Sequence, residues 1–121
     1  MKKFFMLLAA LIGFAFSPQT TPTITAAWTT ICIEDQIGKE SQIQFKVHNT
    51  GANPFTDCRV QSWVGPDSDD WVDISINWTA CISLAADAMT TWEITGSSHE
   101  KLRVQVQSTL GTSAYCRPYG N

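Results

Sequence analysis

The sequence has little basic charge and little histidine. It contains 8 lysine and arginine residues against 11 aspartate and glutamate residues, and only 2 histidines. Nucleic acids and anionic membrane surfaces both require clustered Lys and Arg in a protein that binds them. The composition therefore argues against either of these as a partner.

Long hydrophobic runs are also missing, apart from one at the N-terminus. Phe4 to Phe16 form an apolar stretch of 13 residues that follows Lys2 and Lys3. As a helix this stretch would rise only about 20 Å, too little for a hydrocarbon core of ~30 Å. A basic start before a short apolar run is typical of a secretory signal rather than of a core helix or strand. We predict a signal over residues 1–19, with cleavage possible as late as residue 27, and no stable membrane insertion after processing.

The chain that remains after this cleavage is small and acidic. Without Lys2 and Lys3, six basic and eleven acidic residues are left, a formal charge of −5. About 95–105 residues are enough for one hydrophobic core and one domain, which we predict over residues 28–121. The predicted location is secreted, periplasmic or at the cell surface.

The spacings typical of zinc sites, such as Cys-x-x-Cys, are absent, although the chain has four cysteines. An even number of cysteines in a small exported domain predicts two disulfides, and three pairings are possible. Placement on the expected strands favours Cys58 with Cys81, and Cys32 with Cys116. These bonds would close loops of 23 and 84 residues. In the chain-entropy model the two loops are worth about 3 and about 4–5 kcal/mol.

From Trp28 onward the apolar residues recur with a period close to two, which indicates strands. Residues 83–89 (SLAADAM) could form a helical turn, but their brevity favours a loop that enters a strand. About seven short strands, separated by Gly, Pro, Asn and Asp, predict an all-β fold. The expected architecture is an immunoglobulin-like or fibronectin-III-like antiparallel β-sandwich. The alternating runs lie at 31–33, 43–47, 58–64, 74–78, 88–94 and 102–106, with a short final strand at 115–116.

The stretch NTGANPFTDCRV, residues 49–60, lies between two of these runs. Asn and Gly accept the positive φ that a sharp reversal requires, and Asn53-Pro54 keeps the chain extended. We predict a corner between two strands here.

Two segments resemble the repeated modules of bacterial extracellular proteins called CARDB-like domains. They are Asn-Thr-Gly at 49–51 with the following Pro-Phe-Thr, and LAADAMTTWEI at 84–94. The resemblance spans roughly residues 40–108. The sequence differs from the family pattern at Asp87, where these modules usually have glycine, and it has four additional cysteines. The resemblance implies an immunoglobulin-like sandwich without catalytic residues, because such modules are generally spacers, adhesion units or assembly units.

Polar side chains and one tryptophan occupy the predicted outward face of two strands. Successive residues of a strand face opposite sides, so if Val60 and Val64 point inward, Arg59, Gln61 and Trp63 point outward. Residues 102–107 show the same alternation of apolar and polar side chains. The two strands are usually neighbours in an immunoglobulin-like sheet, so their outer faces would merge. Arg and Trp are enriched at binding hot spots, although long side chains also cover ordinary solvated faces. The predicted binding residues are Arg59, Gln61, Trp63, Arg103, Gln105 and Gln107.

The acidic loop at 65–73 is the candidate metal site. Asp67, Asp69 and Asp70 could offer oxygen ligands to calcium, but the loop lacks the glycine and distal glutamate of an EF-hand. A solvated turn is the alternative reading. No other cofactor is predicted.

Other motifs carry less chemistry. Neither His48 nor His99 is flanked by a nucleophile motif such as G-x-S-x-G, so no catalytic residue is predicted. Asn77-Trp78-Thr79 matches a glycosylation sequon, which matters only in a eukaryotic secretory pathway. Trp78 and Trp92 are expected in the core, Trp28 near an edge, and Trp71 has no predicted place.

The predicted function is that of a small exported, non-enzymatic binding or adhesion module, which recognises a protein or a glycan through one sheet face. A structural subunit of an extracellular or virion assembly is the first alternative. A secreted enzyme inhibitor is the second, and it would need GPDSDD or TGSSHEK as its contact loop.

Overall fold

The computed structural model describes residues 21–34, 42–75, 78–95 and 99–120. The predicted signal at 1–19 and Asn77 of the sequon lie outside these residues. In the part of the chain that is described, no helix is both long enough and apolar enough to cross a membrane.

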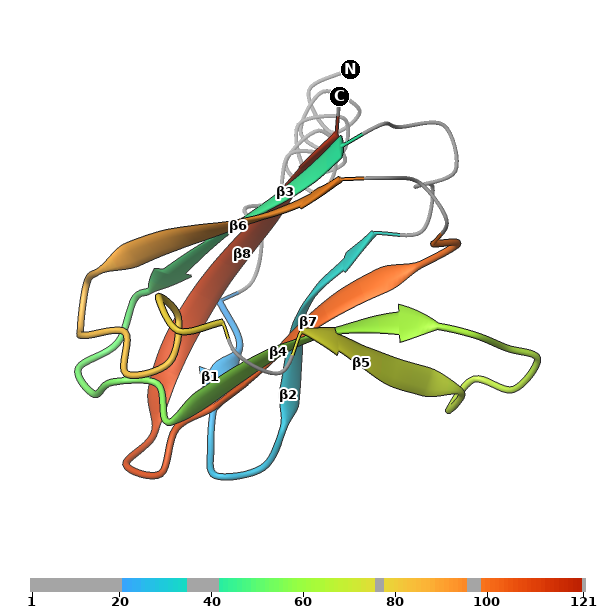
Figure 1. Ribbon diagram of the computed structural model, residues 1–121. Coiled ribbons are helices and arrows are strands. Elements are labelled where there is room, and N and C mark those ends of the chain that lie inside the picture. The colour runs from blue at the N-terminus through green and yellow to red at the C-terminus, as the bar shows by residue number, and fades with distance from the viewer. Residues whose placement is uncertain (1–20, 35–41, 76–77, 96–98, 121) are drawn as a thin grey trace, which may run out of the picture.

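Within these described ranges, eight strands form two antiparallel sheets of four strands each. The strand order is β1-β8-β3-β6 in one sheet and β2-β7-β4-β5 in the other. The strands are β1 Thr23–Ile24, β2 Thr29–Glu34, β3 Gln42–Asn49, β4 Asp57–Trp63, β5 Trp71–Ser75, β6 Met89–Thr95, β7 Leu102–Gln107 and β8 Thr112–Gly120. Figure 1 shows β3, β6 and most of β8 above and the second sheet below. The prediction of an all-β sandwich is confirmed.

The core lies between the two sheets and follows the predicted alternation. The fully buried side chains include Phe45 and Val47 of β3, Val60 of β4 and Val104 of β7. The residues of β3 that alternate with Phe45 and Val47 point to the opposite side of the sheet. Fully burying one such side chain contributes about 1.5–3 kcal/mol. The prediction that β4 and β7 are neighbours is also confirmed, because the two strands pair antiparallel.

Two parts of the alternation were predicted wrongly. Val64 was expected to point inward, but β4 ends at Trp63 and Val64 is 59% exposed. The strand expected at 74–78 is β5 at Trp71–Ser75, because a tight acidic turn brings Trp71 opposite Trp63. Trp78 is buried as predicted, but it lies in a turn, where its ring centre is 5.6 Å from that of Trp92.

The eighth strand, β1, lies upstream of residue 28, where the domain was expected to begin. Ile24 is fully buried in the core and pairs with Thr112 of β8. The carbonyl of Thr25 accepts a hydrogen bond of 2.8 Å from the amide of Ser108. The sandwich therefore includes residues on the N-terminal side of Trp28, and a two-residue strand has too few positions to show a period in the sequence.

The last strand is longer than the predicted pair of residues at 115–116. β8 extends over nine residues and pairs with β3 from Ala114 to Gly120, through Arg117, Pro118 and Tyr119. Proline removes a backbone donor, which normally argues against a strand. It is tolerated at position 118 because β1 pairs with β8 only at residues 112–113, so the other side of β8 needs no donor there.

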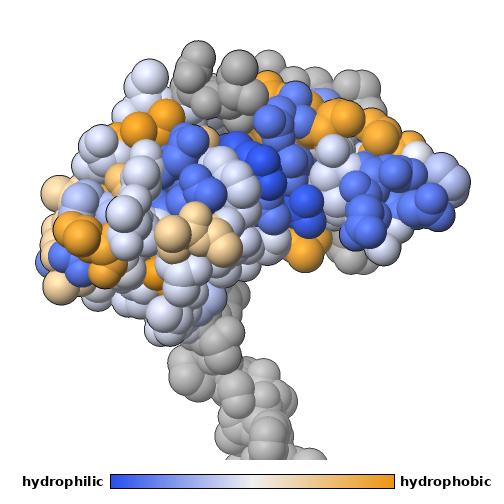
Figure 2. Space-filling model, turned by 90° about the horizontal axis from the view of Figure 1, so that it is seen from below, coloured by the Kyte–Doolittle hydropathy of each residue, from blue (hydrophilic) through white to orange (hydrophobic). Residues whose placement is uncertain are grey.

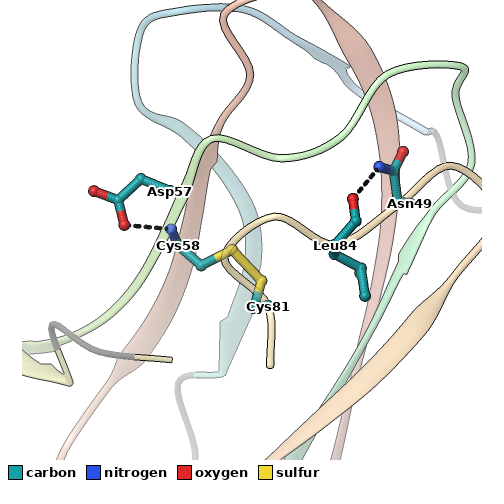
Figure 3. The surroundings of a disulfide bond; sticks show 5 residues. All are labelled: Asn49, Asp57, Cys58, Cys81 and Leu84. Carbon is teal, nitrogen blue, oxygen red and sulfur yellow. Dashed lines mark hydrogen bonds between the residues drawn. A yellow bond between two sulfur atoms is a disulfide. The ribbon is translucent and has the colours of Figure 1, made fainter. Parts of the chain in front are cut away.

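Both disulfides have the predicted pairing. The Cys32–Cys116 bond joins β2 to β8 and therefore links the two sheets. The Cys58–Cys81 bond joins β4 to the turn that follows Trp78, and Figure 3 shows it beside Leu84 and the buried Asn49. The Cα atoms are 5.6 Å and 6.0 Å apart, distances usual for disulfides.

The corner at residues 49–54 is present, but a positive φ does not produce it. Asn49 is fully buried, and its amide Nδ2 donates to the carbonyls of Asn53, at 2.8 Å, and Leu84, at 2.9 Å. Its Oδ1 accepts from the amide of Gly51 and the hydroxyl of Thr112. Gly51 is required for space, since a Cβ there would collide with Thr112 Oγ1 and lie 2.6 Å from a backbone nitrogen.

Positive φ occurs instead in the segment that packs against this corner. Asp87 has φ of 60° and Ser83 has φ of 66°. Asp tolerates this left-handed region better than most residues, and glycine adopts it freely. Residues 83–88 form a loop that enters β6, as predicted, rather than a helical turn.

Candidate functional site

Arginine and glutamine side chains form a crossed pattern on the outer face of the sheet β2-β7-β4-β5. The register places Arg59 opposite Gln105, and Gln61 opposite Arg103. Arg59 Nε donates to Gln105 Oε1, and Arg103 Nε donates to Gln61 Oε1, both at 2.8 Å. We call these four residues the arginine–glutamine ladder. Four of the six predicted binding residues are thus brought into direct contact.

The amide groups of the two glutamines extend the ladder to the outer strands. Gln61 Nε2 donates to Asp73 Oδ1 of β5 at 2.7 Å, and Gln105 Nε2 donates to Thr30 Oγ1 of β2 at 2.9 Å. Both glutamines are only 6% exposed. These hydrogen bonds therefore connect all four strands. The ladder holds each arginine through its Nε atom, so the other guanidinium N–H groups do not take part in the ladder bonds.

Each arginine of the ladder also stacks on a tryptophan. The guanidinium carbon Cζ of Arg59 lies 4.1 Å from the ring centre of Trp28, and that of Arg103 lies 4.3 Å from the ring centre of Trp71. Such cation–π contacts contribute about 0.5–1 kcal/mol at exposed sites. Burial and the charge of Arg59 lower the pKa of the Arg103 guanidinium below its ordinary value, while Asp69 acts in the opposite direction.

Trp63 lies on the outward face, as predicted, at one end of the ladder. Its side chain is half-buried, and its indole Nε1 donates to the carbonyl of Asp67 at 2.8 Å. The Lys101 Nζ lies 4.7 Å from the centre of the ring. Gly65 has φ of 53° and packs under the ring, which would be 2.8 Å from a Cβ at that position. The tight turn therefore holds the Trp63 ring in one orientation.

A hollow of about 510 Å³ opens beside the ring of Trp63. We call it the tryptophan hollow. It is lined by Ile33, Trp63, Pro66, Ser68, Trp71 and Lys101. Figure 2 views the molecule from the side of this sheet and shows hydrophilic side chains in a band across the middle, with hydrophobic ones beside it.

The sequence did not predict several residues of this site. Trp28 was expected only near an edge, and Trp71 had no predicted place, although both stack on ladder arginines. Ile33 and Lys101 belong to the tryptophan hollow but lie outside the predicted group. Gln107, the sixth predicted residue, is set apart, since its amide donates to the carbonyl of Ala26 at 3.0 Å. The feature of the sequence that could have indicated a role for Trp71 is its position directly after the acidic turn. There it begins the strand that pairs with β4, and it lies opposite Trp63.

The acidic loop forms the turn between β4 and β5. The amide of Asp67 donates to Asp70 Oδ2 at 2.9 Å, and the amide of Asp70 donates to the carbonyl of Asp67 at 3.1 Å. Asp69 is exposed. No three His, Cys, Asp or Glu side chains of the described ranges lie together as metal ligands, so the structure does not assemble Asp67, Asp69 and Asp70 into a calcium site.

Each histidine contacts one side chain that the sequence did not indicate. His48 Nε2 lies 2.9 Å from Asp87 Oδ1 on the surface. His99 Nδ1 lies 2.9 Å from Ser62 Oγ. A serine beside a histidine is the first requirement of a catalytic nucleophile. Ser62, however, points into the sandwich and is only 6% exposed, so a substrate would have little access to its hydroxyl.

No protein-family model matches the chain, and a comparison with curated proteins finds no similar sequence.

Proposed function

We propose that the protein is a small exported binding module, without enzymatic activity, that recognises its partner through the outer face of the sheet β2-β7-β4-β5. The observation that carries the proposal is the arginine–glutamine ladder, stacked on Trp28 and Trp71 and continuous with the tryptophan hollow. Arginine and tryptophan are the residue types that most often dominate binding energy at interfaces.

The ladder supports binding because it fixes side chains that are otherwise costly to order. Immobilising one long side chain at an interface costs about 0.5–1.5 kcal/mol. Arg59 and Arg103 are already held by a glutamine on one side and a tryptophan on the other. A partner that contacts their free guanidinium donors would therefore lose less conformational entropy than it would on mobile arginines.

A protein partner fits this face better than a glycan does. Ile33 lines the tryptophan hollow and is 57% exposed. Exposed aliphatic side chains beside aromatic and arginine anchors are typical of the centre of a protein interface. A glycan remains the second ligand class of the proposal.

Export and family are further parts of the proposal. Disulfides persist in oxidising compartments, so the bonds Cys32–Cys116 and Cys58–Cys81 support a secreted, periplasmic or surface location. The resemblance to CARDB-like modules is in keeping with a non-enzymatic role, because such modules are generally spacers, adhesion units or assembly units.

The experiment is a binding screen of the oxidised, processed protein against protein and glycan arrays, followed by titration of the strongest ligand. Trp63→Ala and Ile33→Ser are expected to weaken binding at least tenfold while the midpoint of thermal unfolding changes little. Leu110→Ala is the matched control, since Leu110 is an exposed hydrophobic residue outside this face. Undiminished binding by both variants would rule out the face as the contact surface.

A structural subunit is the second candidate, and the edge strand β5 favours it. β5 lies at the edge of its sheet and carries the exposed Val72 and Ile74. An exposed edge strand can pair with a strand of another molecule. Analytical ultracentrifugation distinguishes the candidates, because a subunit would associate with itself at micromolar concentration and a monomeric binding module would not.

A further inference from the structure

A second surface, on the opposite sheet, has its own chemistry. β3, β6 and β8 carry a shallow groove of about 420 Å³ on the face that points away from the core. We call it the tyrosine groove. Its principal residues are Lys46, His48, Met89, Tyr115, Arg117 and Tyr119. None of them belongs to the arginine–glutamine ladder or to the tryptophan hollow.

Two positive charges lie directly opposite each other in this groove. Lys46 of β3 pairs in register with Arg117 of β8. Like charges at directly opposed positions of an antiparallel pair are destabilising. Neither side chain forms an ion pair with any residue that the structure describes. Among the residues that the structure describes, these two adjacent cations therefore have no counterion, in a chain whose net charge is −3.

Tyr119 holds these two cations together. The Lys46 Nζ lies 4.4 Å from the centre of its ring, and the Arg117 guanidinium carbon lies 4.8 Å from it. The negative face of an aromatic ring attracts cations, so one ring partly offsets the repulsion between the two charges and fixes their position. The carboxylate of Asp87 contacts His48, and Glu93 lies on the neighbouring strand β6, opposite Gln44.

The rest of the groove offers contacts for the body of a ligand rather than for its charge. Tyr115 of β8 is half-buried and lies opposite His48. Met89 of β6 lies opposite His48 on its other side and is 74% exposed. β3 is hydrogen-bonded on both sides, to β6 and to β8, so a peptide could not add to it as a further strand. Only side chains are available to a ligand above this central strand, namely aromatic, aliphatic and cationic groups.

We propose that the tyrosine groove binds an acidic saccharide, a sugar unit that carries a carboxylate or a sulfate. The anion lies between Lys46 and Arg117, where the guanidinium can donate two parallel hydrogen bonds to it. The apolar face of the sugar ring packs on Tyr115 and Met89. Tyr119 is a positioning residue, which holds the two cations in place before the ligand arrives.

The test measures binding of two probes, a galacturonic acid oligomer and a sulfated heparin hexasaccharide, by isothermal titration calorimetry on the oxidised protein. The carboxylate and sulfate arms distinguish the two sources of the anion. We expect the wild type to bind at least one of them, with an affinity that falls as salt rises. Lys46→Gln and Arg117→Gln should each weaken binding at least tenfold, and a methyl-esterified oligomer should not bind. Lys101→Gln, which removes one cation from the opposite face, should bind like the wild type.

Tyr119 provides a separate readout. Tyr119→Phe keeps the ring and should bind within about twofold of the wild type, whereas Tyr119→Leu should lose most of the affinity. The proposal is overturned if neither acidic saccharide binds the wild type, if Lys46→Gln and Arg117→Gln bind normally, or if a glutamate-rich peptide competes as well as the saccharide does. Trp63→Ala should leave saccharide binding unchanged, so failure of this site and failure of the proposed protein-binding face are distinguishable.

Discussion

Arg103 and Trp71 are in contact although their strands are not hydrogen-bonded to each other. β4 lies between β7 and β5, yet the guanidinium carbon of Arg103 is 4.3 Å from the ring centre of Trp71. The contact passes over Gln61, which accepts a hydrogen bond from Arg103 and donates one to Asp73 of β5. The outer face of the sheet is therefore connected by side chains as well as by backbone.

This connection can be measured with a double-mutant cycle on Arg103→Gln and Trp71→Ala. The coupling free energy is expected to be about 0.5–1 kcal/mol, the range of a partly exposed cation–π contact. Urea denaturation of the wild type, both single variants and the double variant supplies it. In a control cycle, Arg103→Gln with Leu110→Ala should be additive within about 0.5 kcal/mol. Additivity in the Trp71 cycle as well would show that the stack stabilises nothing.

Asn49→Ala is expected to lower the free energy of unfolding by about 2–4 kcal/mol. The reason is that the Thr112 hydroxyl loses its acceptor and the carbonyls of Asn53 and Leu84 lose the Nδ2 donor, although the Leu84 carbonyl keeps the amide of Phe55. An unsatisfied buried polar group costs about 1–3 kcal/mol. Denaturation with guanidinium chloride measures the change. Thr50→Ala is the neighbouring control; Thr50 is exposed and should change stability by no more than about 0.5 kcal/mol. An equal effect of the two substitutions would contradict the central role of the Asn49 side chain.

The two disulfides should differ in their contribution to stability. Replacing Cys32 and Cys116 with alanine opens a loop with a sequence separation of 84, whereas Cys58 and Cys81 enclose 23. The chain-entropy model predicts a loss of about 4–5 kcal/mol for the first pair and about 3 kcal/mol for the second. Denaturation of the two double variants at equal concentration checks the order. The reverse order would show that interactions in the folded state, rather than loop length, decide the effect.

The position of β1 limits where the proposed secretory signal could be removed. Cleavage after Ala27 would delete Ile24, a fully buried core residue, together with the carbonyl of Thr25 that Ser108 binds. We expect the mature N-terminus to lie upstream of Pro22, and mass spectrometry of the exported protein determines it. Ile24→Ala should cost about 2–5 kcal/mol, as truncation of a buried isoleucine usually does. A mature chain that begins at Trp28 and folds with full stability would contradict this.

The sequence predicted the strands whose apolar residues alternate with polar ones over several positions. β3, β4 and β7 each place successive side chains on opposite sides, so Phe45, Val60 and Val104 could be assigned to the core from the period alone. β1 could not be predicted because two residues show no period. β8 was predicted too short because Pro118 suggests the end of a strand unless the free edge beside it is known.

The candidate site could be predicted only in part, for a related reason. Alternation places Arg59, Gln61 and Trp63 on one face, and that holds regardless of the neighbouring strands. The contacts of Trp71 depend on the register between β4 and β5, which is set by the turn at residues 64–70 and a bulge after Val60. The tyrosine groove requires Lys46 and Arg117 to be opposite, although they are 71 positions apart in the sequence. Such pairings follow from topology and cannot be read from local pattern.

The Cys32–Cys116 bond has a mechanical consequence. Tension that enters the chain before Cys32 and leaves it after Cys116 passes through that single covalent link. The residues enclosed by the bond would then bear no load, so a molecule pulled by its ends should keep that part of the sandwich folded until the bond is reduced, whereas Trp28, Arg117 and Tyr119 lie outside the bond and are not protected by it. Force spectroscopy that recorded a lengthening of the oxidised chain by the whole enclosed loop would refute this.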